Sequence, residues 1–316
     1  MLGYRKGSDD LLEMPDMFER YMKLGEAAFE NEEYEEARDC FEEAYSLKND
    51  PLANLSLVRS LTKLKEFKSA YAIILENKRI YIVEKSNQSV YFEVLLQLTY
   101  FLEIEKLLAQ KSLVNQQDFE KAYRIAKDYH LMVYKEKFKK LEIEVTSLVD
   151  YPSFQQGKYL KKLIFLPKEI VISLAKELLV NPDVSLFSKN ELVQHLVQLR
   201  LTEPVEVLTY DNKVVSFVGS ETLTLNEAYQ NNQVLKEVSD YFEQHNPSLK
   251  KEVLSTIKIH IGCLYPFQDE VMKPVQSWVE EYLEKYGQGS HSITDSKVQN
   301  IQERLDEEVL KLMSFD

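Results

Sequence analysis

An aromatic residue followed three positions later by alanine occurs twice near the start of this chain, at an interval of 33 residues. The first pair is Tyr34 and Ala37, and the second is Phe67 and Ala70. A period of this length is typical of repeat proteins in which each unit is a pair of antiparallel helices. It therefore predicts a helical repeat scaffold and indicates no particular chemistry.

The residues around the first pair suit two helices that cross closely. Gly25 and Ala37 are small where the backbones are expected to approach, and aromatic side chains stand beside them. The segment resembles a tetratricopeptide repeat (TPR), and eight residues carry the resemblance: Tyr21, Leu24, Gly25, Ala27, Tyr34, Ala37, Phe41 and Ala44. The resemblance extends over residues 18–84 and weakens towards residue 150.

The later copies are less regular. The second keeps its apolar positions, but Asn54 stands where a large side chain is usual. A third aromatic and alanine pair, Phe119 and Ala122, comes 52 residues after Phe67. The extra length falls in the apolar-rich segment 91–113, which predicts one long helix buried on more than one side.

The pattern changes after residue 151, because Pro152 disfavours helix at the residue before it. Helices are predicted over 167–180, 189–199, 233–244 and 249–264, with Ser188 and Glu191 as a capping box for the second. Valines on both sides of Asp211-Asn212-Lys213 predict a β-hairpin over 204–217, and 222–225 is a candidate third strand.

Residues 287–290 are predicted to form a linker, and an amphipathic helix is predicted beyond them. Its apolar stripe can pack on the preceding domain or dock on another subunit, which makes the helix a candidate oligomerisation element. The stripe consists of Val298, Ile301, Leu305, Val309 and Leu312.

We therefore expect a mainly α protein, with a TPR-like superhelix followed by a small α+β domain that contains one hairpin. The expected domains are residues 14–150, 151–286 and 287–316.

The composition indicates which kinds of partner and which cellular compartment suit this protein. The formal net charge is −13, and residues 1–50 hold 15 acidic and 6 basic side chains. This charge argues against a nucleic-acid binder with a basic surface. The two cysteines, Cys40 and Cys263, form no disulfide framework, and no segment approaches the length of a membrane span. A reduced, cytoplasmic protein is expected.

No catalytic or metal-binding motif is apparent. The five histidines are dispersed, without the spacing of a metal site. His260 lies in an apolar run and is expected to be a hydrogen-bonded core residue rather than a base that activates Cys263. We expect a protein that is not an enzyme and needs no cofactor.

Two helices followed by a hairpin are also compatible with a winged helix that binds nucleic acid. In that alternative, residues 189–196 form the recognition helix and Lys189, Arg200 and Lys213 contact phosphates. The protein would then be a peptide-sensing transcriptional or RNA-linked regulator. Because so few cations are available, a structural α+β domain is the preferred interpretation.

The TPR resemblance implies that the first helix of each pair lines a groove that binds a peptide or a partner helix. A chaperone-type carboxylate clamp is not expected, since Met22 and Glu26 occupy positions of clamp residues. The chain also resembles a poorly characterised class of bacterial cytosolic TPR proteins. The expected function is a scaffold or adaptor, with groove residues Glu19, Met22, Glu26, Phe29, Glu30, Leu52, Leu55, Arg59, Thr62 and Lys63.

Overall fold

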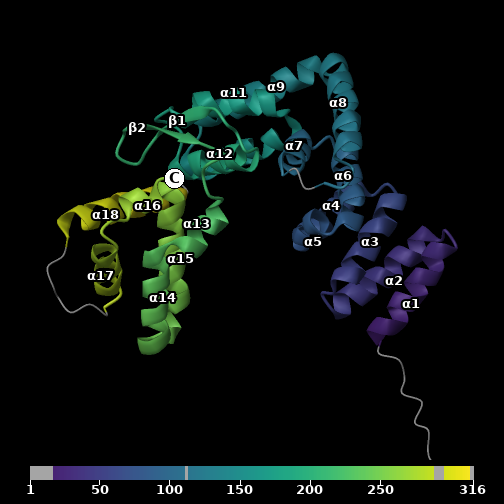
Figure 1. Cartoon of the computed structure of the whole chain (residues 1–316), viewed down its shortest axis with the longest axis horizontal. Coiled ribbons are helices and arrows are strands. Elements are labelled where there is room, and N and C mark those ends of the chain that lie inside the picture. Colours follow the sequence, from purple (N-terminus) through teal and green to yellow (C-terminus); the bar gives the residue numbers. More distant parts are fainter. Residues whose placement is uncertain (1–16, 111–112, 288–294, 314–316) are drawn as a thin grey trace, which may run out of the picture. The chain divides into compact units, whose positions relative to one another are not determined.

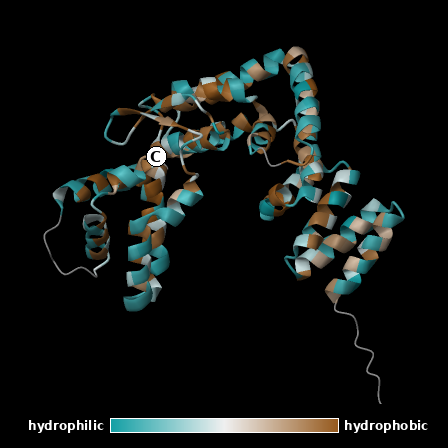
Figure 2. Ribbon diagram, viewed as in Figure 1, coloured by the Kyte–Doolittle hydropathy of each residue, from teal (hydrophilic) through white to brown (hydrophobic). Residues whose placement is uncertain are grey.

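The computed structural model describes residues 17–110, 113–287 and 295–313 (Figure 1). It confirms the mainly α fold, because the described residues form 18 α-helices and one two-stranded antiparallel sheet. Brown and teal residues alternate along most helices in Figure 2, as expected for helices that bury one side. The described residues divide into two compact units: unit 1 comprises 17–99 and 113–115, and unit 2 comprises 100–110, 116–287 and 295–313.

Unit 1 consists of successive helices that pack on their neighbours in sequence. Helix α1 packs on α2, α2 on α3, and α3 on α4, so the two predicted helix pairs are present. The bounds are α1 Met17–Glu30, α2 Tyr34–Leu47, α3 Pro51–Lys63, α4 Phe67–Glu76, α5 Lys78–Val83 and α6 Gln88–Gln97, with a short 3₁₀ helix at Lys85–Asn87.

The repeat is also present in the backbone turns. Glu32 and Lys65, 33 residues apart, both have positive φ, at 64° and 62°. In each case the next amide donates to the carbonyl five residues earlier, which is the hydrogen bond that closes a helix in the Schellman motif. Thr99 has a φ of 57° and separates α6 from α7, so the prediction of one long helix over 91–113 is wrong.

The close crossing of α1 and α2 is confirmed. A Cβ atom built on Gly25 would lie 2.7 Å from Cε1 of Phe41, whose side chain is buried together with Ala37 and Ala44. Two of the eight residues that carry the TPR resemblance are not packed in the core: Leu24 and Ala27 are exposed, whereas Ala28 is buried.

Gly25→Ala tests this crossing. Alanine is favoured over glycine in a helix by about 1 kcal/mol, but overpacking a filled core costs about 1–3 kcal/mol, so we expect a net loss in the free energy of unfolding. Gly157→Ala is the matched control, because Gly157 is helical and a Cβ there meets nothing within 4 Å. Denaturant unfolding should show the control gaining stability; a gain for both variants would contradict the close approach.

Unit 2 starts earlier than the predicted boundary at residue 150. Helices α7 Phe101–Ala109, α8 Gln116–Val133 and α9 Lys135–Thr146 belong to it. Salt bridges join these helices to the residues after 150: Lys127 to Glu169 at 3.2 Å, Lys168 to Glu105 at 3.4 Å and Lys162 to Glu144 at 2.6 Å. The predicted third repeat copy in α8 is therefore in a different unit from the first two.

The rest of unit 2 is a helical assembly with the predicted hairpin. Its helices are α10 Ser153–Leu160, α11 Lys168–Leu179, α12 Leu186–Gln198, α13 Leu225–Asn231, α14 Gln233–His245, α15 Pro247–Leu264, α16 Gln268–Val271, α17 Val275–Lys285 and α18 Ser296–Met313. Short 3₁₀ helices span Ser147–Asp150 and Lys161–Phe165. Strands β1 Pro204–Leu208 and β2 Val214–Val218 pair so that Val207 faces Val215.

Two local predictions in this region are wrong. Helix α12 starts one turn earlier than predicted, because Ser185 is the N-cap and its side chain accepts a hydrogen bond from the amide of Ser188. The candidate strand at 222–225 is instead the start of α13, where Thr224 and Glu227 form a capping box.

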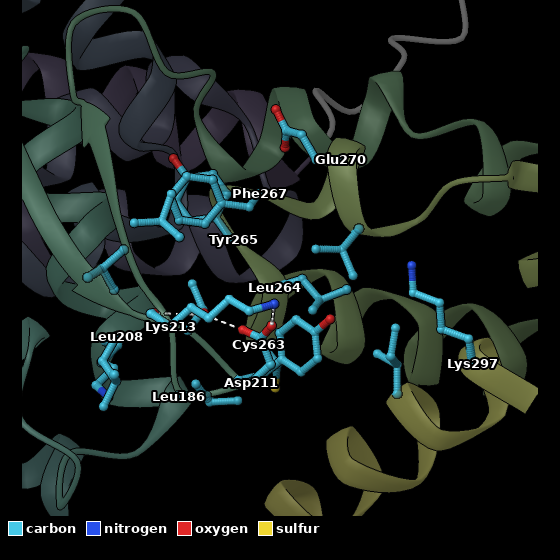
Figure 3. Close-up of a pocket in the computed structure, with 17 residues that line it drawn as sticks. Leu186, Leu208, Asp211, Lys213, Cys263, Leu264, Tyr265, Phe267, Glu270 and Lys297 are labelled. Carbon is cyan, nitrogen blue, oxygen red and sulfur yellow. Dashed lines mark hydrogen bonds and ion pairs between the residues drawn. The ribbon is translucent and has the colours of Figure 1, made fainter.

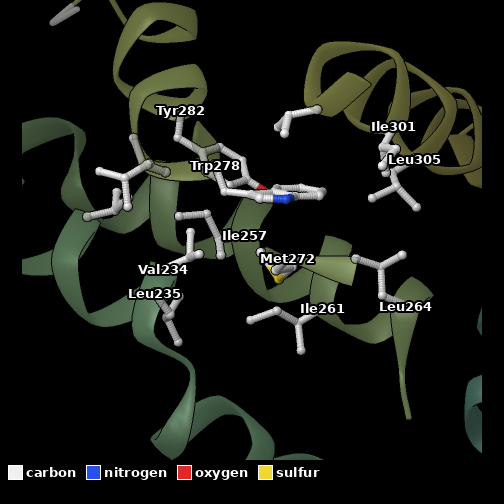
Figure 4. Packing of buried hydrophobic residues seen from close by; sticks show 14 of the residues in the cluster. Val234, Leu235, Ile257, Ile261, Leu264, Met272, Trp278, Tyr282, Ile301 and Leu305 are labelled. Atoms are coloured by element: carbon white, nitrogen blue, oxygen red, sulfur yellow. The ribbon is translucent and has the colours of Figure 1, made fainter. Parts of the chain in front are cut away.

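The principal core of unit 2 surrounds Trp278 (Figure 4). Side chains from α14, α15, α17 and α18 meet there, and the three residues Val298, Ile301 and Leu305 of the C-terminal stripe are buried among them. The amphipathic helix therefore packs on its own domain, the first of the two alternatives, and is part of unit 2 rather than a separate segment. The linker predicted at 287–290 lies outside the described residues except for Gly287.

Candidate functional site

The predicted groove residues of unit 1 fall into two groups. The charged residues are exposed: Glu19, Glu26 and Glu30 on α1, and Arg59 and Lys63 on α3. Leu52 is exposed as well, and Phe29 is half-buried.

Three other predicted groove residues are core residues and do not face a partner. Met22, Leu55 and Thr62 are only 7%, 8% and 8% exposed. Large apolar side chains are more stable inside, and the Thr62 hydroxyl donates to the Val58 carbonyl at 2.8 Å. The predicted groove residues that remain exposed on α1 and α3 are therefore mostly charged, because the buried ones are uncharged.

Two residues of the predicted groove are brought together through Tyr34. The Phe29 and Tyr34 rings meet edge to face with centroids 5.3 Å apart. Lys63 Nζ lies 6.0 Å from the centroid of the Tyr34 ring, within the range of a cation–π interaction. Residues from α1, α2 and α3 thus meet at one place on unit 1. Tyr34 was predicted to be a packing residue, and its ring also contacts the amine of Lys63.

The charged side chains of this surface are not neutralised by their neighbours. None of Glu19, Glu26, Glu30, Arg59 and Lys63 takes part in a salt bridge with another described residue. Arg59 and Lys63 are one helical turn apart, so both can reach the same acidic group on a partner. We call these five residues and Phe29 the charged face of unit 1.

A buried polar pair, Asn54 of α3 and Tyr81 of α5, joins two helices of unit 1, and its role was not predicted from the sequence. The Tyr81 hydroxyl donates to Oδ1 of Asn54 at 2.7 Å, and Nδ2 of Asn54 donates to the Ile73 carbonyl at 3.0 Å. Burial raises the pKa of Tyr81, so this donor keeps its proton. The signal for this pair was Asn54 itself, a polar residue at an otherwise apolar helix position.

Unit 2 contains a cavity of about 400 Å³ between the hairpin, the start of α12 and the end of α15 (Figure 3). Its walls are mainly apolar, and α16 and α18 contribute to them. The apolar residues include Leu186, Val207, Leu264, Phe267, Val271 and Ile301. A volume of this size lies within the range of small-molecule sites in proteins.

Lys189 lines this cavity and is only 5% exposed. Burial lowers the pKa of its amine to about 8, although the negative charge of Glu308 opposes the shift. The amine makes no salt bridge or hydrogen bond with any other residue in the described ranges. Lys189 is therefore unavailable to contact phosphates on a surface, as the winged-helix alternative requires.

The other charged residues at the cavity lie nearer to solvent. Lys213 and Asp211 form a salt bridge of 2.6 Å within the hairpin turn, which Figure 3 shows as a dashed contact. Lys297 lies on the opposite side, at the start of α18, and Glu270 comes from α16. The lining thus contains three lysines and two carboxylates, an excess of one positive charge in a chain whose formal net charge is −13.

Cys263 also lines the cavity but is not activated. Burial raises the pKa of its thiol to about 12, so the thiol is protonated near neutral pH. His260 lies 2.8 Å from the Tyr282 hydroxyl through Nδ1 and 3.1 Å from Oδ1 of Asp306 through Nε2. Both ring nitrogens are therefore occupied, and His260 is a hydrogen-bonded core residue, as predicted.

The His260 contacts attach the C-terminal helix to the core. An ionised carboxylate can only accept, so Nε2 of His260 donates to Asp306, and in the neutral imidazole Nδ1 then accepts from Tyr282. Lys285 forms a salt bridge with the other oxygen of Asp306. Burial acts to raise the pKa of Asp306, but the hydrogen bonds from His260 and Lys285 outweigh it, so this pKa is lowered.

Comparison with known proteins gives no assignment: no family model matches the chain, and neither does any curated protein or solved structure. Among the described residues, no group of three or more His, Cys, Asp or Glu side chains is placed to hold a metal ion. No helix within those residues has the length and apolar character needed to cross a membrane.

Proposed function

We propose that the protein is a non-catalytic interaction scaffold or adaptor and that the charged face of unit 1 binds a peptide or a partner helix. The observation that supports this most directly is the set of exposed, unneutralised charges on α1 and α3, two helices of consecutive helix pairs. Charges of opposite sign on these two helices can select a partner with the complementary arrangement. The TPR resemblance supports the same function.

The acidic residues of α1 and the basic residues of α3 indicate which side chains the partner carries. An acidic side chain of the partner would contact Arg59 and Lys63, while basic side chains would contact Glu26 and Glu30. Phe29 and the Tyr34 ring offer an apolar contact between them. The partner is therefore expected to carry acidic and basic residues on one side, with an apolar residue between them.

Charge reversal tests the charged face. In affinity capture from the native cell, Arg59→Glu combined with Lys63→Glu should reduce recovery of the specific partner at least about tenfold, because each lost contact becomes a repulsion. Lys68→Glu combined with Arg79→Glu is the matched control, since both residues are exposed, lie on α4 and α5, and give the same change in net charge.

The comparison needs both variants to be folded, which circular dichroism and unfolding midpoints can establish. A partner recovered equally well with wild type and both variants would contradict the proposal. Equal loss with both variants would indicate a nonspecific dependence on net charge. Nucleic-acid binding by unit 2 is disfavoured, because Lys189 on the recognition helix of that alternative, α12, is buried and Lys213 is paired with Asp211.

A further inference from the structure

A buried lysine without a partner requires explanation. Moving a charged amine out of water is unfavourable unless an opposite charge or several acceptors replace the water. Lys189 has 5% of its surface exposed, and among the described residues it has no carboxylate within salt-bridge distance. Yet its side chain lines an open volume of about 400 Å³, which leaves room for a group that supplies the missing charge.

The position of α12 also favours an anion in this cavity. Leu186, the first residue of this 13-residue helix, lines the cavity together with Lys189 in the first turn. The start of a helix carries a partial positive charge from its free amides. The helix end and the lysine amine therefore act in the same direction. Of the nearby carboxylates, Asp211 is paired with Lys213 and Glu308 with Lys311, and Glu270 of α16 remains as a negative charge in the cavity wall.

The remaining walls indicate what is attached to the anionic group. Val207, Phe267 and Ile301 are apolar and come from the hairpin, the segment after α15 and α18. A fully hydrated ion such as phosphate would gain nothing from such walls, whereas an apolar chain or ring would be buried favourably.

We infer that the cavity of unit 2 is a binding site for a small carboxylate with an apolar body, whose carboxylate pairs with the amine of Lys189. This site is separate from the charged face of unit 1, and the two can be tested independently. The shared chemistry, a carboxylate next to an apolar group, occurs in medium-chain fatty acids and in the terminal residue of a peptide.

Calorimetric titration of the full chain with octanoate and with N-acetylleucine tests both sources of this chemistry. Each should bind at least about tenfold more tightly than its neutral analogue, octanol or N-acetylleucinamide. The carboxylate that binds more tightly identifies the source. Lys189→Met keeps an unbranched side chain, slightly shorter than lysine, and removes the charge, and it should abolish the preference for the carboxylate over the neutral analogue.

Two further variants serve as controls for the calorimetric titration. Lys189→Arg retains the charge and should retain the preference, while Lys236→Met removes an exposed lysine on α14, away from the cavity lining, and should change the affinity less than about threefold. The inference is overturned if octanoate and octanol bind wild type equally, if Lys189→Met retains the preference, or if neither carboxylate binds at about 10 mM. Unfolding curves verify that each variant is folded.

Discussion

Trp278→Ala is expected to lower the free energy of unfolding of unit 2 by about 3–5 kcal/mol, the usual cost of removing a fully buried tryptophan. Trp278 is completely buried, and α14, α15, α17 and α18 all contribute side chains to the core around it (Figure 4). Denaturant unfolding measures the loss. Hydrogen exchange should show that protection falls in these four helices and is retained in α1–α4, because unit 1 has a separate core.

Trp278→Phe is the matched control for this experiment. It keeps an aromatic ring in the core and removes the indole N–H, which is buried without a hydrogen-bond partner among the described residues. Because an unsatisfied buried donor is itself unfavourable, the phenylalanine variant should lose much less stability than the alanine variant. Equal loss of protection in α1–α4 would show that the two units do not unfold separately.

Lys189→Met is expected to raise the free energy of unfolding by about 3 kcal/mol below pH 8, in the absence of ligand. Burial lowers the pKa of Lys189 from 10.5 to about 8, so between these values the unfolded chain binds more protons than the folded chain. The stability of wild type relative to the variant therefore rises with pH through this window. Below pH 8 the wild type retains the full cost of the buried charge.

Unfolding measured at pH 7 and again near pH 10 checks this prediction. The difference between Lys189→Met and wild type should be large at the lower pH and small at the higher one. Lys297→Met, which removes an exposed lysine from the same cavity, should show no such pH-dependent difference. A methionine variant less stable than wild type at pH 7 would show that the amine is compensated in the folded protein.

The helix pairs of unit 1 were predictable because their packing depends on residue size at fixed spacing. Tyr34 with Ala37 and Phe67 with Ala70 mark the starts of α2 and α4. A positive φ occurs again at Thr99, two residues before Phe101. The corresponding small residue is lost there, since Ile104 stands three positions after Phe101, and the sequence signal for this turn is therefore absent.

The sites were less predictable than the helices. A helical period identifies positions that share one side but does not show how many sides are covered, so the winged-helix alternative could place Lys189 on an exposed recognition surface. Eight of the 13 residues of α12 are buried. The same limit explains Met22 and Leu55, which were placed on a binding surface and lie in the core.

The attachment of α18 has a consequence for folding during synthesis. Residues 298–305 complete the core around Trp278, and Asp306 is the partner of His260, 46 positions earlier. Unit 1, in contrast, is built from contacts between successive helices. Such local contacts can form as the chain emerges from the ribosome, whereas α14, α15 and α17 expose part of their apolar surface until α18 has been made. We therefore expect unit 2 to expose apolar surface for longer during synthesis than unit 1 does.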